Sequence, residues 1–337
     1  MPKQLPAAFL LFGQEGVGKQ LLARALSQSL LCENAAVSGE PCGHCDGCHL
    51  FEVGNHPDFR LLQPDRENGE SGKNAPTKGV PGAKKPSALI SVDAVRDLAG
   101  LTATAAHRGG VKVIMIDPAE SLHPSAGNAL LKMLEEPGKK THFILVTNKK
   151  NSVLPTIRSR CFQLPVQVPT IEEARSWLAI THSEHVEIAL CLASYAPFAA
   201  LELVDNNEFW ERRHLLLTRL ADAAANPLDL ASLADQFEPV ALGRMLSMWV
   251  FDLLALQQGA DIRYHRDMRA ELTVLASTVV GSELCNWSDE VRAFSRAAQH
   301  PLNRRLALES LFAHWPGSRI RLAGTSGQPL ATKSTFS

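Results

Sequence analysis

The sequence lacks an excess of either charge, an apolar run of membrane length and a secretion signal. Its 337 residues include 34 basic and 35 acidic side chains. The net charge of −1 argues against a strongly basic nucleic-acid-binding protein, although a local basic patch would fit within that total. The apolar stretch AAFLLFG near the N-terminus is too short for a membrane span and has no cleavage site. We therefore expect a cytoplasmic protein with no membrane partner.

A magnesium ligand is missing from a loop that otherwise has the pattern of a phosphate-binding P-loop. The residues GQEGVGKQ have the Gly-x4-Gly-Lys spacing, which makes Gly13, Gly16, Gly18 and Lys19 candidates for contacts with nucleotide phosphates. An apolar run precedes the loop and a helical pattern follows it, as a P-loop requires. The next position normally carries Ser or Thr, whose hydroxyl binds Mg²⁺, but here it is Gln20.

Two further elements of ATP hydrolysis are absent. The apolar pattern VKVIMID ends at Asp117, a candidate metal-site residue. It is followed by Pro118, where hydrolysing P-loop proteins carry a Glu that acts as a base. Between Arg175 and Arg212 there is no Lys or Arg that could reach a γ-phosphate. With the missing hydroxyl, these gaps predict a chain that does not hydrolyse ATP. Because Lys19 and the loop amides remain, ATP binding is left open.

Seven cysteines in a chain of this kind indicate metal binding more than disulfides. Four of them follow the pattern Cys-x9-Cys-x2-Cys-x2-Cys, at Cys32, Cys42, Cys45 and Cys48. Thiolates two residues apart in a tight turn can face one ion, and four of them close a tetrahedral shell. We therefore predict a structural zinc site, with redox chemistry as the alternative. His44 and His49 could replace a ligand, but we expect both to be exposed.

The order of the patterns predicts an α/β domain followed by helices. Apolar strand patterns alternate with helical ones at first, which indicates a parallel sheet. The segment 64–87 has almost no larger aliphatic side chain, so we expect a disordered insertion. Only helical patterns follow Pro169. The expected organisation is a P-loop domain at 1–167, a small helical domain at 168–206, a larger one at 207–316 and a flexible tail at 317–337.

Two arginines follow the third strand pattern, in the sequence RSRC from Arg158 to Cys161. One interpretation is the solvated end of a strand. The other is that one arginine projects to a neighbouring subunit as an arginine finger, where its guanidinium would stabilise charge on another protein's nucleotide.

These segments, taken in order, resemble the clamp-loader branch of the AAA+ family. The resemblance rests on LPAAFLLFGQEGVGK, the four-cysteine segment, NALLKMLEEP and IRSRC. It is strong over residues 6–165 outside the insertion and weaker over the rest. It implies an α/β AAA+ module with an inserted zinc knuckle, a three-helix lid and an all-α collar domain. It also implies a hetero-pentameric ring with the gamma/tau and delta subunits of DNA polymerase III, which places the sliding clamp on primed DNA during replication.

Within that family, the missing catalytic residues are similar to those of a rigid stator subunit that has no ATPase activity of its own. The resemblance implies that Arg160 completes the ATP site of a neighbouring motor subunit, with Ser159 and Cys161 fixing its position. Two alternatives stay open: a hydrolysing motor subunit of gamma or tau type, and a zinc-dependent nucleic-acid-binding module on a P-loop fold. The family usually has a helical segment before the first motif, where this sequence has only about five residues. Either the true start lies upstream or the nucleotide site is poorer still.

Overall fold

The computed structural model describes residues 5–64, 89–108, 110–138, 140–179, 185–222, 224–297 and 303–319. The chain divides into two compact units, Met1–Pro169 and Thr170–Ser337. The predicted insertion 64–87 lies outside the described residues except for Pro64, and the predicted tail lies outside them except for 317–319.

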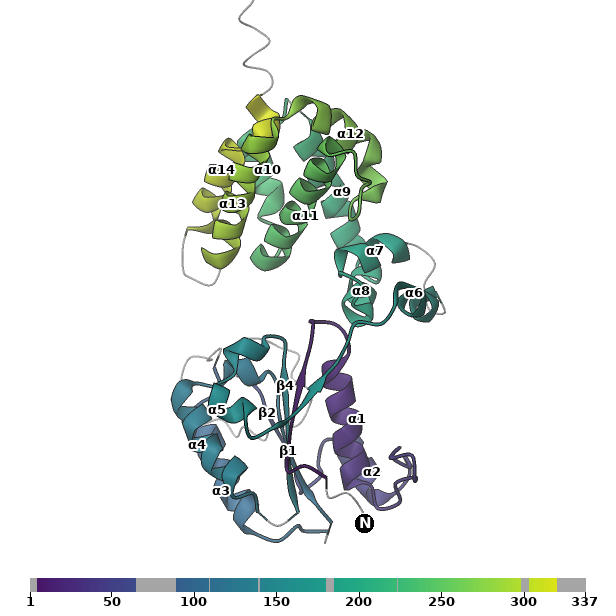
Figure 1. Ribbon diagram of the computed structural model, residues 1–337, viewed down its shortest axis with the longest axis vertical. Coiled ribbons are helices and arrows are strands. Elements are labelled where there is room, and N and C mark those ends of the chain that lie inside the picture. Colours follow the sequence, from purple (N-terminus) through teal and green to yellow (C-terminus); the bar gives the residue numbers. More distant parts are fainter. Residues whose placement is uncertain are drawn as a thin grey trace, which may run out of the picture. The chain divides into compact units, whose positions relative to one another are not determined.

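The N-terminal unit is a parallel five-stranded sheet with helices on both faces, as the sequence predicts (Figure 1). The strands lie in the order β2 (Phe59–Leu62), β3 (Lys112–Ile116), β4 (Thr141–Thr147), β1 (Ala8–Phe12) and β5 (Phe162–Pro165). Every neighbouring pair is parallel, so all five strands begin at one edge of the sheet and end at the other.

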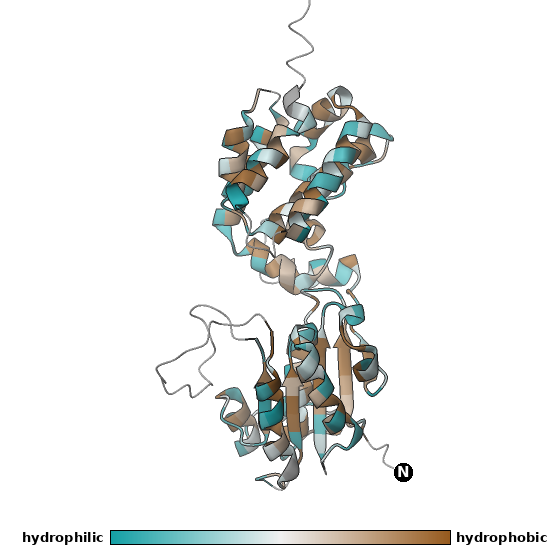
Figure 2. Ribbon diagram, turned by 90° about the vertical axis from the view of Figure 1, so that its left-hand side faces the viewer, coloured by the Kyte–Doolittle hydropathy of each residue, from teal (hydrophilic) through white to brown (hydrophobic). Residues whose placement is uncertain are grey.

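Alternate side chains of the central strands enter two separate cores, so both faces of these strands are apolar. The hydropathy colouring of Figure 2 shows the strands of the sheet as mostly hydrophobic. Leu10 and Ile114 belong to the core on one face, and Leu11 and Met115 belong to the core on the other. The first face is covered by α3 (Val92–Ala103), α4 (Pro124–Glu135) and α5 (Pro155–Arg158), and the second by α1 (Lys19–Leu31) and α2 (Asp46–Glu52).

The described residues of the C-terminal unit form helices and no strand. The helices are α6 (Ile171–Ala179), α7 (Val186–Leu192), α8 (Pro197–Val204), α9 (Asn207–Ala221), α10 (Pro227–Ala234), α11 (Pro239–Gln257), α12 (Arg269–Thr278), α13 (Gly281–Ala297) and α14 (Arg304–Ala313). A capping box begins α6: the Glu173 carboxylate accepts the N–H of Thr170 at 2.8 Å, and Oγ1 of Thr170 accepts the N–H of Glu173 at 3.3 Å. A Thr followed three residues later by a Glu is the sequence signature of such a box.

Helix α11 corrects the expectation that no apolar run reaches membrane length. Its 19 residues are long and apolar enough to cross a membrane, by length and composition only. Half of its most apolar stretch is buried, and Leu246, Trp249 and Leu253 belong to the helical core. The core helix of a globular protein can have the same length and composition, and burial explains the apolar composition of α11.

Candidate functional site

The predicted P-loop connects β1 to α1 and has backbone geometry that favours glycine. Gly16 and Gly18 have φ angles of 78° and 91°. A Cβ on Gly13 would lie 2.2 Å from a main-chain oxygen of the segment after β5, so this position has no room for a side chain. Lys19 begins α1 and is 4% exposed. Its Nζ donates a hydrogen bond to the carbonyl oxygen of Gln14, 2.6 Å away, so the lysine is bonded to its own loop.

A carboxylate that sequence analysis missed lies near Lys19. Asp117 follows β3, and after Pro118 the chain makes a short turn, η1 (Ala119–Ser121), that contains Glu120. Oε1 of Glu120 accepts the N–H of the first residue after β4, at 3.1 Å. Burial lowers the pKa of the Lys19 ammonium, and the carboxylates of Glu120 and Asp117 act in the opposite direction. Glu120 lies two positions beyond the place where a P-loop ATPase carries its base, so the sequence pattern gave no signal for it.

Ser159, Arg160 and Cys161 form the turn between α5 and β5. The Ser159 hydroxyl donates to the carbonyl oxygen of Thr156 at 3.0 Å, within the last turn of α5. Cys161 is 8% exposed and belongs to the core beneath α4 and α5. Burial raises the pKa of its thiol to about 12, so it is a neutral packing residue at pH 7. The residues on either side of Arg160 are thus both fixed.

The Arg160 guanidinium is held at two points and remains partly in solvent. Nη1 donates to the carbonyl oxygen of Thr156 at 3.0 Å, and Nη2 pairs with Oε1 of Glu135 at 2.5 Å. The Arg160 side chain is 36% exposed. The other arginine of the motif, Arg158, donates instead to the side-chain oxygen of Asn151 at 3.1 Å. Only Arg160 therefore reaches the end of α4.

Arg160 and the P-loop lie at opposite edges of the sheet. In the parallel pairing of β1 with β5, Phe9 is beside Phe162 and Phe12 is beside Pro165. Arg160 precedes the first of these pairs, whereas the P-loop follows the second. Four residues of strand span roughly 13 Å. The arginine is therefore not placed to serve this chain's own loop.

The four predicted zinc ligands come together where α1 ends and α2 begins. Cys32 caps the end of α1 and Cys45 caps the start of α2, with their Sγ atoms 3.8 Å apart. The Sγ atoms of all four cysteines, Cys32, Cys42, Cys45 and Cys48, lie within 4.8 Å of one another. Ligands about 2.3 Å from a central zinc lie roughly 3.8 Å apart at the corners of a tetrahedron. The donor set and its spacing fit a zinc ion.

Main-chain donors favour a thiolate at Cys45, whereas burial raises the pKa of the Cys48 thiol to about 12. The N–H of Cys45 donates to Sγ of Cys42, and the N–H of Cys48 donates to Sγ of Cys45, each at 3.4 Å. Burial raises the pKa of the Cys45 thiol, but the hydrogen bonds outweigh it and lower the pKa to about 6. His44 and His49 are exposed, and Nδ1 of His44 bonds to the carbonyl oxygen of Cys42 at 2.7 Å. Neither histidine belongs to the cluster of four sulfur atoms.

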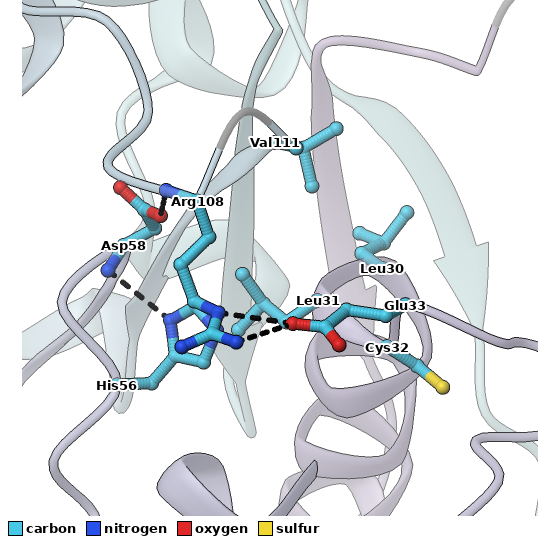
Figure 3. A pocket seen from close by; sticks show the side chains of 9 residues that line it. Leu30, Leu31, Cys32, Glu33, His56, Asp58, Arg108 and Val111 are labelled. Atoms are coloured by element: carbon cyan, nitrogen blue, oxygen red, sulfur yellow. Dashed lines mark hydrogen bonds and ion pairs between the residues drawn. The ribbon is translucent and has the colours of Figure 1, made fainter. Parts of the chain in front are cut away.

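Arg108 connects both halves of the cysteine cluster to the sheet domain. Figure 3 shows the half at Cys32, where the guanidinium meets the Glu33 carboxylate. Its Nε and Nη2 donate to Oε1 of Glu33, the residue after Cys32, at 3.0 and 2.7 Å. Nη2 also donates to Oδ2 of Asp46, the residue after Cys45, at 3.3 Å. One guanidinium thus bridges the segments that carry two of the four cysteines.

The main chain of Arg108 is anchored as well. The carboxylate of Asp58, which is 1% exposed, accepts the N–H groups of His107 and Arg108 at 2.8 and 3.2 Å. Nδ1 of His56 in turn accepts the N–H of Asp58 at 3.1 Å, and burial lowers the pKa of this imidazole. His56, Asp58 and Arg108 line a cavity of about 70 Å³ beside Cys32. The contacts of Arg108 could not be predicted from the sequence, because Glu33 and Arg108 are 75 positions apart.

Two family models match the chain: "DNA polymerase III, delta subunit" over residues 2–170, and "DNA polymerase III, delta subunit, C terminal" over residues 207–316. The DNA polymerase III subunit delta' of Pseudomonas aeruginosa is 31% identical over 329 residues, which cover 91% of this chain and 91% of that protein. The subunit delta' of Escherichia coli is 33% identical over 283 residues, covering 82% of this chain and 78% of that one.

A second kind of relative matches a shorter region. The DNA polymerase III subunit tau of Escherichia coli is 33% identical over 180 residues, which cover 53% of this chain and 24% of the tau chain. Among solved structures, a gamma subunit-related protein of DNA polymerase III from Thermotoga maritima aligns over 94% of this chain and 96% of that chain. Its sequence identity is 17% and its TM-score is 0.47.

Proposed function

Because the chain belongs to the delta-prime family of DNA polymerase III clamp-loader subunits, we propose that it is a stator that supplies an arginine finger to a neighbouring ATPase subunit. In this proposal the chain has no ATPase activity of its own. Residues 168–206 are the lid and 207–316 the collar of a ring that it forms with gamma/tau and delta subunits. That ring loads the sliding clamp onto primed DNA in the cytoplasm.

The observation that carries the proposal is the position of Arg160. It lies at the edge of the sheet opposite to the chain's own P-loop, with 36% of its side chain exposed. A guanidinium in this position can meet a phosphate only if another subunit brings that phosphate to it. Its planar fork suits two phosphate oxygens at once, and such donors stabilise the charge that develops during phosphoryl transfer.

The chain's own loop supports the same assignment. Lys19 is bonded to Gln14, and the exposed Gln20 has no hydroxyl for Mg²⁺. Glu120 is a carboxylate close to Lys19, but its Oε1 already accepts a hydrogen bond from the main-chain N–H of Asn148. We infer that the P-loop is retained as a packed connection between β1 and α1, and that nucleotide is not required for the fold.

Zinc is the cofactor that the proposal includes. Cys32, Cys42, Cys45 and Cys48 would hold it through four thiolates, which leaves no open position for a reacting water. Its contribution when bound is therefore structural. The cysteines fix the ends of α1 and α2 relative to one another, and Arg108 connects that corner to the sheet domain.

The experiment that tests the proposal is single-turnover ATP hydrolysis in an assembled ring whose only competent ATP site is the one facing this chain. Arg160→Ala should lower the rate by about 10³-fold or more, since arginine fingers contribute roughly 10³–10⁵ in rate. Arg158→Ala is the matched control, because Arg158 lies two residues away and donates to Asn151, whereas Arg160 pairs with Glu135. An unchanged rate with Arg160→Ala would remove the arginine finger from the account.

A hydrolysing motor subunit is the second candidate, favoured by the similarity to subunit tau over 53% of this chain. It predicts steady ATP turnover by the chain itself that disappears with Lys19→Ala. The stator predicts no turnover above background, even with clamp and primed DNA present. Glu120→Gln separates the two further, because it should change nothing unless Glu120 takes the place of the missing base.

A further inference from the structure

Glu135 holds the Arg160 side chain, and we propose that it is the positioning residue of the arginine finger. The proposal rests on the proposed function, in which Arg160 acts on a neighbouring nucleotide. It adds that the guanidinium is set in place by a carboxylate of this chain before the neighbour's phosphate arrives.

The two residues come from different elements that are packed at a fixed distance. Glu135 is the last residue of α4, and Arg160 follows α5. The helices approach closely at Gly127 of α4, where a Cβ would lie 2.7 Å from Cδ1 of Leu154 and 3.6 Å from Cδ1 of Ile157. Leu134, Ile157 and Cys161, the neighbours of these two residues, pack in one core, and this packing brings Glu135 beside the turn that carries Arg160.

The guanidinium is restrained through both of its Nη atoms. Nη2 pairs with Glu135 at 2.5 Å, and Nη1 donates to the Thr156 carbonyl oxygen at 3.0 Å. The negative end of α4 adds to the attraction for a cation at this position. A long arginine side chain otherwise loses much rotational freedom when it binds phosphate. Ordering it in advance lowers that cost at the moment of reaction.

The restraint is also weak enough to share the guanidinium with a phosphate. Both partners are open to solvent, with 36% of the Arg160 side chain and 50% of the Glu135 side chain exposed. Ion pairs of this kind are individually weak, and a phosphate with several oxygen acceptors is the stronger partner. Glu135 therefore orders Arg160 without sequestering it.

The neighbouring Glu136 provides a matched control. It is also exposed, it follows Glu135 directly, and its side chain makes no ion pair within the described part of the chain. If negative charge at the end of α4 were sufficient, the two glutamates would be equivalent. If the contact with Arg160 matters, only Glu135 should respond.

The test uses the assembled ring with only the facing ATP site competent, and measures single-turnover hydrolysis. Glu135→Gln should lower the rate about two- to fivefold, the factor expected for an exposed ion pair. Glu135→Lys, which places a second cation against Arg160, should lower it more than about tenfold. ATP affinity at that site, ring assembly and the unfolding temperature of this chain should not change. Glu136→Gln and Glu136→Lys should leave the rate at its original value.

Repeating the Glu135 substitutions in an Arg160→Ala background separates the inference from the function on which it rests. There they should have no further effect. If Arg160→Ala itself leaves the rate unchanged, the arginine-finger function is wrong. If Arg160→Ala lowers the rate but Glu135→Gln behaves like Glu136→Gln, increases the rate, or acts equally in both backgrounds, Glu135 does not position the finger.

Discussion

Arg108 and Arg160 each lie in a connection between a helix and the next strand of the N-terminal unit, before β3 and β5 respectively, but their surroundings differ. Their side chains are 34% and 36% exposed, and each pairs with a glutamate at or just after the end of a helix. Arg108 donates to two carboxylates, Glu33 and Asp46, and its main-chain N–H is held by Asp58. Within the described residues, Arg160 has a single carboxylate partner, Glu135.

Under the proposed function, exposure alone does not distinguish a structural arginine such as Arg108 from one that acts on another subunit. What distinguishes the two arginines is how many hydrogen-bond acceptors each guanidinium has and which segments of the chain supply them. Arg108 is shared among acceptors of its own chain, so it holds the cysteine cluster against the sheet domain. Arg160 has one weak charge partner and lies at the edge away from its own P-loop, so it is available to another subunit. We expect substitutions at the two sites to affect different measurements.

The largest expected effect is on hydrolysis at the facing ATP site. Arg160→Lys keeps the positive charge but loses the planar fork, so the single-turnover rate should fall by about a hundredfold or more. Zinc content and unfolding temperature should stay the same. Arg158→Lys is the control and should change the rate only slightly. A nearly normal rate with Arg160→Lys would mean that charge alone is sufficient and that the geometry of the fork is not used.

The next effect concerns the four-cysteine cluster, which Arg108 connects to the sheet domain. Replacing both Cys42 and Cys45 with Ala should abolish zinc binding, from one ion per chain to none. It should also lower the free energy of unfolding by something on the order of 4 kcal/mol, since structural metal sites contribute directly to folding. Metal analysis and chemical denaturation measure the two quantities. Cys285→Ala removes an exposed cysteine outside the cluster and should retain the zinc. Zinc retained by the double variant would contradict the assignment.

A smaller effect is expected when Arg108 is replaced with Ala. Glu33 and Asp46 would then lie beside the thiolates without their shared cation, so zinc should pass to a chelator about tenfold faster. Hydrolysis at the facing site should not change in rings that retain their zinc. Arg96→Ala is the control, because Arg96 is 70% exposed and its 3.5 Å pair with Asp93 lies within one helix. Equal release rates for the two variants would show that Arg108 does not stabilise the site.

The sequence predicted the parallel sheet because its three central strands, β1, β3 and β4, are five to seven residues long and each contains an unbroken run of four or five apolar residues. The outer strands β2 and β5 have four residues each and mixed burial, which is too little for a pattern to indicate a strand. The capping box at Thr170 was predictable because its partners are three residues apart.

The candidate site was predictable only where a local motif carries it. The P-loop, the four cysteines and the Arg160 motif each lie within a short segment. Glu135 was visible in the segment NALLKMLEEP, but its contact with Arg160 depends on how α4 and α5 pack. Arg108 contacts residues 62 and 75 positions away, and no single-sequence pattern encodes contacts at such distances.

We propose that this chain contributes to ATP hydrolysis through Arg160, at the ATP site of a neighbouring subunit, and not through its own P-loop. The most direct test compares Arg160→Ala with Lys19→Ala in the same ring, by single-turnover hydrolysis at the facing site. The account predicts a loss of about 10³-fold or more with Arg160→Ala. With Lys19→Ala it predicts an unchanged rate, provided that the variant still assembles. The opposite pattern, a rate that depends on Lys19 and not on Arg160, would contradict it.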